Sequence, residues 1–413
     1  MKKAVIVSCF DNYSYEVRTK YIEKVLRDMG YRTVIVAGDF DHRNKVTYHV
    51  ERDGLKMIHV PTYKRNLSVG RIYSHYIYGH KVERILRKIK PELVYAITPP
   101  NFEFSAVSNY KKKAKRDAKV VYDVVDMWPE TLPVTGMLKK LASPFLSVWK
   151  SIRNKALPDA DGILYECNLF RDTVNDDLGE ILSKKGVLQK RVYLCKKDSM
   201  IFEKSSPLGR ALTSGGFESM LEKGPDFKET GENQNSFKII YLGAINNITD
   251  IELIGKVIAE IAKRRKVVLH FIGNGEGIDT LKELTEAAGA RFINHGIVYD
   301  EYEKARIMGD ADAALNIMKE TVYIGATMKS LDYFSLGIPV INSVKGDTAK
   351  LMEEYGAGVS VSNENYKNNI RDFLSKDKNA VEDMRKASRR LFLDNFEEEK
   401  IEGELAEFFE MVL

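Results

Sequence analysis

The sequence predicts an α/β protein with two doubly wound domains in series, and three observations support this prediction. The chain has 413 residues, which is too long for one ordinary hydrophobic core and sufficient for two. Short β-branched apolar runs alternate with amphipathic helical patterns, as in parallel sheets covered by helices. The alternation stops near residue 203 and starts again near residue 236, so each half is expected to form its own sheet.

The first domain is expected over residues 1–202. Apolar runs bounded by turn residues predict its strands, and helical spacing of apolar residues fills several of the gaps. The predicted strands are Ala4–Val7, Thr33–Ala37, Met57–Val60, Leu93–Ile97, Val120–Val124 and Gly162–Tyr165, and the predicted helices include Tyr15–Met29 and Ile72–Ile89.

Residues 203–235 are interpreted as a linker with an extra loop, because Gly, Ser and Pro are frequent there and its last residues are wholly polar. The second domain is expected over residues 236–396, followed by a helix over about 397–413. Its predicted strands are Lys238–Leu242, Val267–Ile272, Ala313–Ile317, Pro339–Ile341 and Gly358–Val361, and its predicted helices are Asp250–Lys263, Ile278–Ala288, Met328–Leu336 and Thr348–Glu354.

The composition, 44% hydrophobic and 30% charged, is typical of a globular protein and excludes disordered and fibrous classes. Charge is distributed unevenly: residues 1–200 contain 37 Lys and Arg against 23 Asp and Glu, and the remainder contains 27 against 36. A basic first half favours an anionic partner. Its densest basic run, residues 111–116, has no interleaved aromatic residues. We therefore expect no nucleic-acid partner, and an anionic membrane surface is the other candidate.

The three cysteines, at positions 9, 167 and 195, are far apart and lack metal-ligand spacing. This predicts a reducing compartment and no structural metal. No run approaches the roughly 18 apolar residues that a membrane span needs. The apolar residues after Lys3 stop at Asp11 without a cleavage site, so they are interpreted as a strand and not as a secretion signal. We expect a cytoplasmic protein, with peripheral binding at the inner face of the membrane as a further option.

Two segments of the second domain could hold a phosphorylated ligand. Gly273-Asn274-Gly275 precedes a predicted helix but lacks the third glycine of a dinucleotide fingerprint, so a plain turn and a ligand contact both stay open. A second helix starts near Thr327, with Lys329 in its first turn and Asp332 on the same face. Its partly positive N-terminus and the lysine suit a diphosphate, and the carboxylate suits ribose hydroxyls. A surface ion pair between Lys329 and Asp332 is the alternative.

A third segment, Asp126-Met127-Trp128-Pro129-Glu130, follows a predicted strand of the first domain. Ligands of doubly wound sheets bind at the carboxyl ends of the strands. Trp128 is expected to pack in the core. Asp126 and Glu130 are candidates for chemistry, because ionic groups are costly to bury there without a partner.

These segments resemble signatures of the retaining family-4 glycosyltransferases, which have the GT-B fold of two facing Rossmann-like domains. Residues 126–130 are similar to the Asp-x-Trp-Pro-Glu signature of a bacterial polysaccharide subset, and residues 329–341 resemble the Lys-Leu-x-Asp/Glu-Tyr helix and the strand after it. The resemblance extends from Lys3 to about Val361. Three further motifs occur in the order of that family: Thr98-Pro99-Pro100, Tyr241-Leu242-Gly243 and Gly273-Asn274-Gly275.

The resemblance implies transfer of a sugar, with retention of configuration, from a nucleotide-sugar donor to a glycan or lipid-linked acceptor. It implies no cofactor and no obligatory metal. The second domain would hold the donor, the first would hold the acceptor, and the last helix would cross back to the first domain. Asp126 and Lys329 would be catalytic, and Asp332 would hold the ribose. The other implied donor-binding residues are Thr327, Ser330, Gly243, Asn246, Gly273 and Gly275, and the acceptor-binding residues are Tyr13, Arg18 and Glu130.

Three positions depart from the family pattern. Ile324 stands where a glutamate is usual, residues 243–247 contain no cation, and the opening loop at residues 11–16 lacks a glycine pair. Because an unneutralised diphosphate is costly for catalysis, Lys329 is the principal expected cation, with Arg18 as a reserve. The second hypothesis is a catalytically degraded GT-B subunit that binds a partner. The third is a sugar-nucleotide epimerase, although the histidines show no acid–base arrangement: His42, His59, His75, His80, His270 and His295.

Residues 132–157 combine apolar and basic side chains, as an interfacial membrane helix does. The alternative is a helix that packs on its own sheet and is interrupted by Pro144. The apolar residues are Met137, Leu138, Leu141, Phe145, Leu146 and Trp149, and the basic ones are Lys139, Lys140, Lys150, Arg153 and Lys155.

Overall fold

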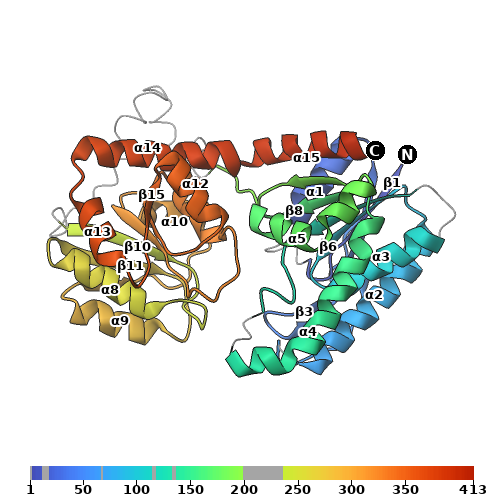
Figure 1. Cartoon of the computed structure of the whole chain (residues 1–413), viewed down its shortest axis with the longest axis horizontal. Coiled ribbons are helices and arrows are strands. Elements are labelled where there is room, and N and C mark those ends of the chain that lie inside the picture. The colour runs from blue at the N-terminus through green and yellow to red at the C-terminus, as the bar shows by residue number, and fades with distance from the viewer. Residues whose placement is uncertain (1, 12–17, 67, 114–117, 133–135, 199–235) are drawn as a thin grey trace. The chain divides into compact units, whose positions relative to one another are not determined.

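The computed structural model describes the chain except for residues 1, 12–17, 67, 114–117, 133–135 and 199–235, so Tyr13 and the predicted linker at 203–235 lie outside the described residues. The chain divides into two compact units. Unit 1 comprises Met1–Leu194 together with Ile401–Leu413, and unit 2 comprises Cys195–Lys400. Figure 1 shows a layer of helices around a central sheet in each of them.

Unit 1 contains a seven-stranded sheet in the order β5-β2-β1-β6-β7-β8-β9, with every pair parallel. The central strands are apolar on both faces because helices cover both sides, as buried parallel strands require. The order reverses between β1 and β6, and such a switch point is where ligands of doubly wound sheets bind. The strands are β1 (Lys3–Val7), β2 (Arg32–Gly38), β5 (Leu55–Ile58), β6 (Leu93–Thr98), β7 (Lys119–Val124), β8 (Gly162–Tyr165) and β9 (Leu188–Arg191), with a separate ribbon of β3 (Phe40–Asp41) and β4 (Val46–Thr47).

The helices of unit 1 include one from the end of the sequence, α15, whose residues from Ile401 onward belong to this unit. The backbone of β8 touches it closely: a Cβ added at Gly162 would lie 2.6 Å from the ring of Phe408. The basic end of α3 is paired, since Lys111 and Lys112 lie 2.5 and 2.7 Å from carboxylates of the same unit. The helices are α1 (Arg18–Asp28), α2 (Val69–Ile89), α3 (Asn101–Lys113), α4 (Gly136–Ala156), the short η1 (Leu157–Asp159), α5 (Asn168–Lys184) and α15 (Glu398–Val412).

Unit 2 repeats this design with six parallel strands in the order β12-β11-β10-β13-β14-β15. Its switch point lies between β10 and β13. The strands are β10 (Ser236–Leu242), β11 (Lys266–Ile272), β12 (Arg291–Asn294), β13 (Ala313–Asn316), β14 (Val340–Asn342) and β15 (Gly358–Ser360), and the helices are α8 (Ile251–Ala262), α9 (Ile278–Ala287), α10 (Glu301–Met308), α11 (Met328–Ser335), α12 (Asp347–Tyr355), α13 (Tyr366–Leu374) and α14 (Lys378–Asn395).

The core of unit 2 lies between its sheet and the helices α8, α9 and α13. Helix α8 contributes Leu253, Ile254, Val257, Ile258 and Ile261, at helical spacing on one face. Asp250 begins this helix by accepting a hydrogen bond from the backbone N–H of Leu253 at 3.0 Å. The packing therefore holds the carboxyl ends of β10 and β13, where the candidate site begins, on a rigid base.

The two doubly wound sheets that the sequence predicts are confirmed. Every predicted strand is present. The strands that were not predicted are β9 and β12, both at a sheet edge, and the short β3 and β4 of the separate ribbon. Within the part of the chain that the structure describes, no helix has both the length and the apolar character required to cross a membrane.

Candidate functional site

The switch point of unit 2 brings together the loop after β10 and the start of α11. Thr327 caps this helix: its hydroxyl accepts a hydrogen bond from the Ser330 amide at 3.3 Å and donates one to Asn316 Oδ1 at 3.1 Å. The Ser330 hydroxyl donates to the Thr327 carbonyl at 2.7 Å and is fully buried. Both predicted donor-binding hydroxyls are therefore engaged inside unit 2, and their observed role is to fix the start of α11.

Lys329 lies across the loop that follows β10. Its ammonium is 3.0 Å from the Tyr241 hydroxyl and 4.3 Å from the centroid of that ring. Its Cε is 3.9 Å from the position that a Cβ would take at Gly243, where φ is +113°. No carboxylate among the described residues lies within 4 Å of this ammonium, so its charge is not neutralised by an acid. A half-buried cation at a helix N-terminus can meet an anion.

Asp332 does not pair with Lys329. Its carboxylate instead forms ion pairs with Lys196 and with Lys304, the latter at 3.1 Å, and both lysines also contact Glu301. Burial would lower the pKa of Lys304, but Asp332 and Glu301 outweigh it and the pKa is raised. The alternative of a surface ion pair within α11 is thus not what the structure shows. Two half-buried lysines that the sequence did not indicate therefore bind the carboxylate that was predicted to hold the ribose.

The glycines after β11 are required by loop packing. A Cβ at Gly273 would lie 2.1 Å from the Gly243 carbonyl oxygen, and one at Gly275 would lie 2.1 Å from the carbonyl oxygen of Ile245. These residues also have φ of +150° and +134°, which disfavours any side chain. Asn246 accepts a hydrogen bond from the Ile248 amide within its own turn at 3.2 Å. The plain-turn reading of residues 273–275 therefore accounts for both glycines, and no ligand is needed to explain them.

In unit 1, Asp126 lies just beyond the carboxyl end of β7. Burial is the main influence on its pKa, which is raised, although the Thr131 hydroxyl, Trp128 and Arg71 each act to lower it. The Thr131 hydroxyl donates to Asp126 Oδ1. A carboxyl group with a raised pKa at a ligand-binding edge can exchange a proton with a substrate.

Two predicted acceptor residues are instead part of the framework of unit 1. Glu130 forms a two-bond ion pair with the fully buried Arg153, at 2.9 and 3.0 Å. Arg18 is 1% exposed, and it binds both oxygens of Asp123 at 2.6 and 2.8 Å and two backbone carbonyls. An arginine held by an ion pair in the interior cannot turn toward an acceptor or a diphosphate without breaking that pair. This environment argues against the expected role of Arg18.

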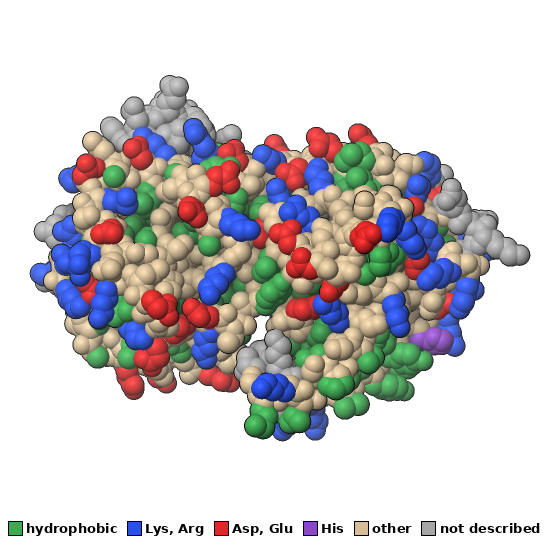
Figure 2. All heavy atoms as spheres, in the orientation of Figure 1, with side chains coloured by type: hydrophobic (Ala, Val, Ile, Leu, Met, Phe, Trp, Pro, Cys, Tyr) green, Lys and Arg blue, Asp and Glu red, His purple; other side chains and the backbone are tan. Residues whose placement is uncertain are grey.

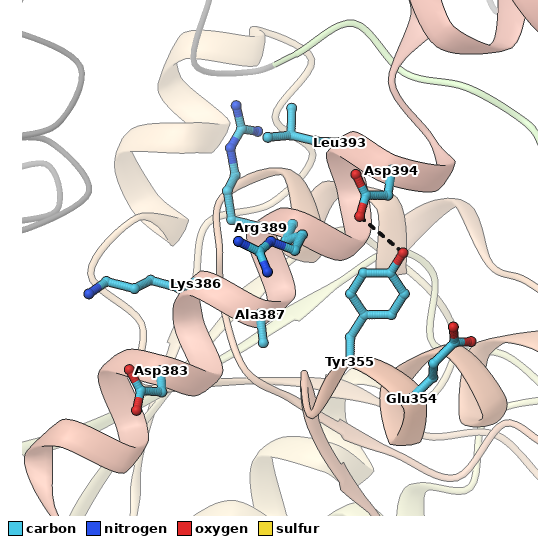
Figure 3. A pocket seen from close by; sticks show the side chains of 9 residues that line it. Glu354, Tyr355, Asp383, Lys386, Ala387, Arg389, Leu393 and Asp394 are labelled. Atoms are coloured by element: carbon cyan, nitrogen blue, oxygen red, sulfur yellow. Dashed lines mark hydrogen bonds between the residues drawn. The ribbon is translucent and has the colours of Figure 1, made fainter.

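Two cavities of unit 2 bear on the search for the site. One, of about 190 Å³, lies at the carboxyl ends of β14 and β15 and is lined in part by Glu320 and Lys345, whose charged groups are 3.8 Å apart. The other, of about 780 Å³, is lined by residues of α12 and α14 alone (Figure 3). There the Tyr355 hydroxyl donates a hydrogen bond to Asp394 at 3.1 Å. None of the site residues that the sequence predicts lines that cavity. We therefore place the candidate donor site at the start of α11.

Comparison with known proteins identifies the second unit. Residues 236–376 match the family model of the group 1 glycosyl transferases. No match was found among curated proteins. The match covers most of unit 2, including β10, Lys329 and Asp332, and it confirms the predicted glycosyltransferase class.

Solved structures resemble the whole chain. Sucrose-phosphate synthase from Thermosynechococcus elongatus has a TM-score of 0.67 at 12% identity, covering 100% of this chain and 99% of that one. WaaG, a glycosyltransferase involved in lipopolysaccharide biosynthesis, has a TM-score of 0.62 at 13% identity, covering 98% and 99%. Anabaena Alr3699/HepE in complex with UDP-glucose has a TM-score of 0.60 at 14% identity, covering both chains completely. These likenesses show the GT-B fold.

Proposed function

We propose that this chain is a glycosyltransferase that transfers a sugar from a nucleotide-sugar donor to a glycan or lipid-linked acceptor. The observation that carries the proposal is Lys329, a cation without an acidic partner among the described residues. It stands at the start of α11 within the segment that matches the group 1 glycosyl transferases. A structurally similar protein, Anabaena Alr3699/HepE, has been solved with UDP and with UDP-glucose, which supports a nucleotide-sugar donor here as well.

In the proposed donor complex, unit 2 binds the nucleotide over residues 236–396. Lys329 and the free amides at the start of α11 receive the diphosphate, since both are positive and face the switch point. One carboxylate oxygen of Asp332 is held by Lys196 and Lys304, which fixes the orientation of the group. The other oxygen is proposed to accept a hydrogen bond from the ribose. Because Asp332 and Glu301 balance the charges of these two lysines, Lys329 is the cation left to stabilise the leaving group.

Asp126 is proposed to act on the reacting hydroxyl or sugar in unit 1. Its raised pKa and its position after β7 support this role. We further propose that the configuration is retained and that no metal cofactor is required, as in the retaining family-4 enzymes that the sequence resembles. A reaction run with and without EDTA tests the second point: loss of turnover in EDTA that added Mg²⁺ restores would contradict it.

We also propose that unit 1 docks on a membrane through one face of α4. Met137, Leu141, Phe145 and Val148 follow helical spacing and are 47–77% exposed. Figure 2 shows apolar side chains beside basic ones at the lower edge of the molecule, where Figure 1 places the start of α4. Apolar side chains of this kind can enter the boundary between headgroups and acyl chains.

Part of the expected membrane face is not available, however. Trp149 is 6% exposed and packs on Trp128 with ring centroids 5.7 Å apart. Lys150 pairs with Asp177 at 2.6 Å, and Arg153 pairs with Glu130. The helix thus combines both sequence-based alternatives: one face packs on unit 1 and the other is exposed. Lys140 is an exposed cation next to Leu141 of the apolar face. The side chain of Lys139 is not among those that the structure describes.

Flotation with anionic vesicles tests the docking proposal. The wild type is expected to float, and the variant with serine at Met137, Leu141 and Phe145 is expected to stay in the soluble fraction. Met411→Ser is the control, since Met411 is 62% exposed but lies on α15. If the wild type and the triple variant distribute alike, the docking proposal fails.

A thermal-shift panel of nucleotides and nucleotide sugars tests the donor proposal, because a ligand that binds only the folded state stabilises it by mass action. Lys329→Met should weaken nucleoside diphosphate binding by about 1.5–3 kcal/mol, the range for a hydrogen bond to a charged group, and leave nucleoside binding almost unchanged. Lys282→Met is the matched control, since Lys282 is an exposed lysine of α9. Wild-type protein that binds no nucleotide would instead favour the degraded partner subunit.

A further inference from the structure

The carboxyl edge of the unit 1 sheet carries a second cluster of ionisable groups beside Asp126. Arg71 and His75 lie one turn apart on α2, and Trp128 follows β7 in the same loop as Asp126. Phe10, which follows β1, and Tyr63 complete an aromatic frame around them. Strands β1 and β7 both end at this edge, which is where a doubly wound sheet binds its ligands.

The guanidinium of Arg71 is held against aromatic rings and not against an acid. Its central carbon is 4.1 Å from the centroid of a Trp128 ring and 5.7 Å from that of Phe10. One terminal nitrogen donates to the Asn66 carbonyl at 3.2 Å. The Nε hydrogen has no acceptor among the described residues, although Arg71 is only 7% exposed. A planar guanidinium with an unused donor is suited to a phosphate or carboxylate.

His75 is also left unsatisfied. It is 1% exposed, its ring stacks on Trp128 with centroids 5.7 Å apart, and neither of its nitrogens has a hydrogen-bond partner among the described residues. Burial, followed by the charge of Arg71, lowers the pKa of His75 well below its ordinary value. The imidazole is therefore neutral and can donate one hydrogen bond. Leaving such buried groups unpaired is costly, and a bound ligand that accepts from both would remove that cost.

The surrounding basic groups indicate the charge of the ligand. Burial and then Arg71 lower the pKa of His42 to about 4, and the same two causes lower the pKa of Lys45. Asp41 acts in the opposite direction on both but does not reverse either shift. The charge of Arg71 therefore reaches two other basic groups and disfavours their charged forms, and an anion bound at Arg71 would relieve this repulsion.

We propose that Arg71 and His75 bind a phosphate or diphosphate ester of the acceptor, with the half-buried Phe10 packing against the group attached to it and Trp128 holding both side chains in place. This inference rests on the proposed function, and it names the chemical class of the acceptor. Asp126 follows the same strand as Trp128 and acts on Arg71 electrostatically, so the acceptor hydroxyl that Asp126 serves would lie near the anchored phosphate.

Anion binding to the full chain tests the proposal. The Lys329→Met background is used so that binding at the donor diphosphate site is suppressed. Inorganic pyrophosphate and geranyl diphosphate are each titrated by calorimetry into this parent, and then into the parent carrying Arg71→Met. The matched control adds Arg87→Met, because Arg87 lies on the same helix but is exposed and paired with Glu83 at 2.7 Å.

We expect Arg71→Met to weaken binding of both anions by at least about tenfold and Arg87→Met to leave it unchanged, as loss of one charged hydrogen bond requires. Tighter binding of geranyl diphosphate than of pyrophosphate assigns the anion to a lipid-linked acceptor, and equal binding assigns it to a soluble one. Either result supports the proposal when Arg71→Met weakens the binding and Arg87→Met does not, because that difference locates the anion at Arg71.

Arg71→Lys is the second variant, in case Arg71→Met does not fold. It keeps the charge but loses the planar fork, and weaker binding than in the parent is expected. Parent-like binding in every folded Arg71 variant, or no binding in the parent, overturns the inference. The panel of nucleotides and nucleotide sugars applied to the wild type keeps the two proposals distinct: absence of binding to every member would defeat the donor proposal and leave the anion result to stand alone.

Discussion

At the carboxyl edge of the unit 2 sheet, polar groups bond to one another, whereas at the same edge of unit 1 buried polar atoms are left without partners. In unit 2, Thr327 bonds to Asn316 and Asp332 to two lysines. In unit 1, Arg71 Nε and both nitrogens of His75 have no partner among the described residues. The same doubly wound design thus produces one edge that is fixed in advance and one that a ligand would complete.

This difference has a physical meaning for recognition. A site whose groups already hold one another pays little to be ordered when the ligand arrives. A site with unsatisfied buried groups gains more from the correct ligand, because that ligand also removes their desolvation cost. We infer that unit 2 provides a preformed donor site and that unit 1 provides selectivity for the acceptor.

The largest effect is expected at Arg18, a buried residue of unit 1 whose hydrogen-bonding groups are paired as fully as those at the edge of unit 2. Arg18→Met removes the partner of the buried Asp123 and should lower the free energy of unfolding by about 3–5 kcal/mol. Arg71→Met leaves no buried carboxylate without its ion-pair partner and should lower the free energy of unfolding much less. Both tryptophans, Trp128 and Trp149, lie in unit 1, so urea unfolding followed by their fluorescence reports this unit. Equal losses for the two variants would remove the distinction between paired and unpaired arginines.

The next effect concerns chemistry at the unit 1 edge. Asp126→Asn keeps the shape of the side chain and removes its charge, so turnover should fall by about 100-fold or more, while nucleotide affinity should scarcely change. Steady-state kinetics and calorimetry measure the two quantities. Asp172→Asn is the control, since Asp172 is a half-exposed residue of α5. A parallel fall in turnover and nucleotide affinity would mean that Asp126 is structural.

A smaller effect tests whether the loop after β11 packs closely on the loop after β10 at the edge of the unit 2 sheet. Gly275→Ala places a methyl group against the Ile245 carbonyl and should destabilise unit 2 by about 1–3 kcal/mol more than Gly289→Ala. Gly289 also has a positive φ, of +76°, but nothing lies within 4 Å of an added Cβ. Hydrogen exchange of the β11 amides measures the difference. Similar exchange in both variants would refute the close packing of the two loops.

The smallest effect is a shift along the pH axis. Burial disfavours the charged form of Asp126 and raises its pKa, so its ionised fraction grows only as pH rises through that higher value. If the ionised form acts, kcat/KM should rise with pH along an acid limb above the ordinary aspartate pKa of about 3.9. The residual activity of Asp126→Asn should lack that limb. A limb that persists in the variant belongs to another group.

Much of the fold followed from the sequence because interior strands and helices have periodic apolar patterns. The edge strands β9 and β12 lack such a pattern. Each is only four residues long, and neither Leu188-Gln189-Lys190-Arg191 nor Arg291-Phe292-Ile293-Asn294 contains the alternation or the longer apolar run by which a strand is recognised.

The site was predictable only where its contacts are local. The helix start, Lys329 and Asp332 fall within one turn, and their placement on α11 was predicted correctly. Lys196, by contrast, reaches Asp332 across 136 residues of sequence. No spacing rule links residues so far apart. Arg71 was likewise identified only from the structure, because Trp128 is distant from it in the sequence. The role expected for Arg18 disagrees with the structure because a basic residue near an opening loop looks the same in sequence whether it faces a ligand or an interior aspartate.

The close contact between Gly162 and Phe408 has a consequence for biosynthesis. A ribosome releases residues 1–194 first, yet the helix that covers β8 is made only after all of unit 2. N-terminal domains ordinarily fold first and as units. Here we expect β8 to lack its contacts with Phe408 and Val412 while some 200 residues of unit 2 are synthesised. We expect stalled chains ending at residue 194 to be cut by protease near β8, and chains that extend through residue 413 to resist. The first unit therefore begins synthesis first but is completed last, and we expect chaperones to bind the nascent unit until α15 is made.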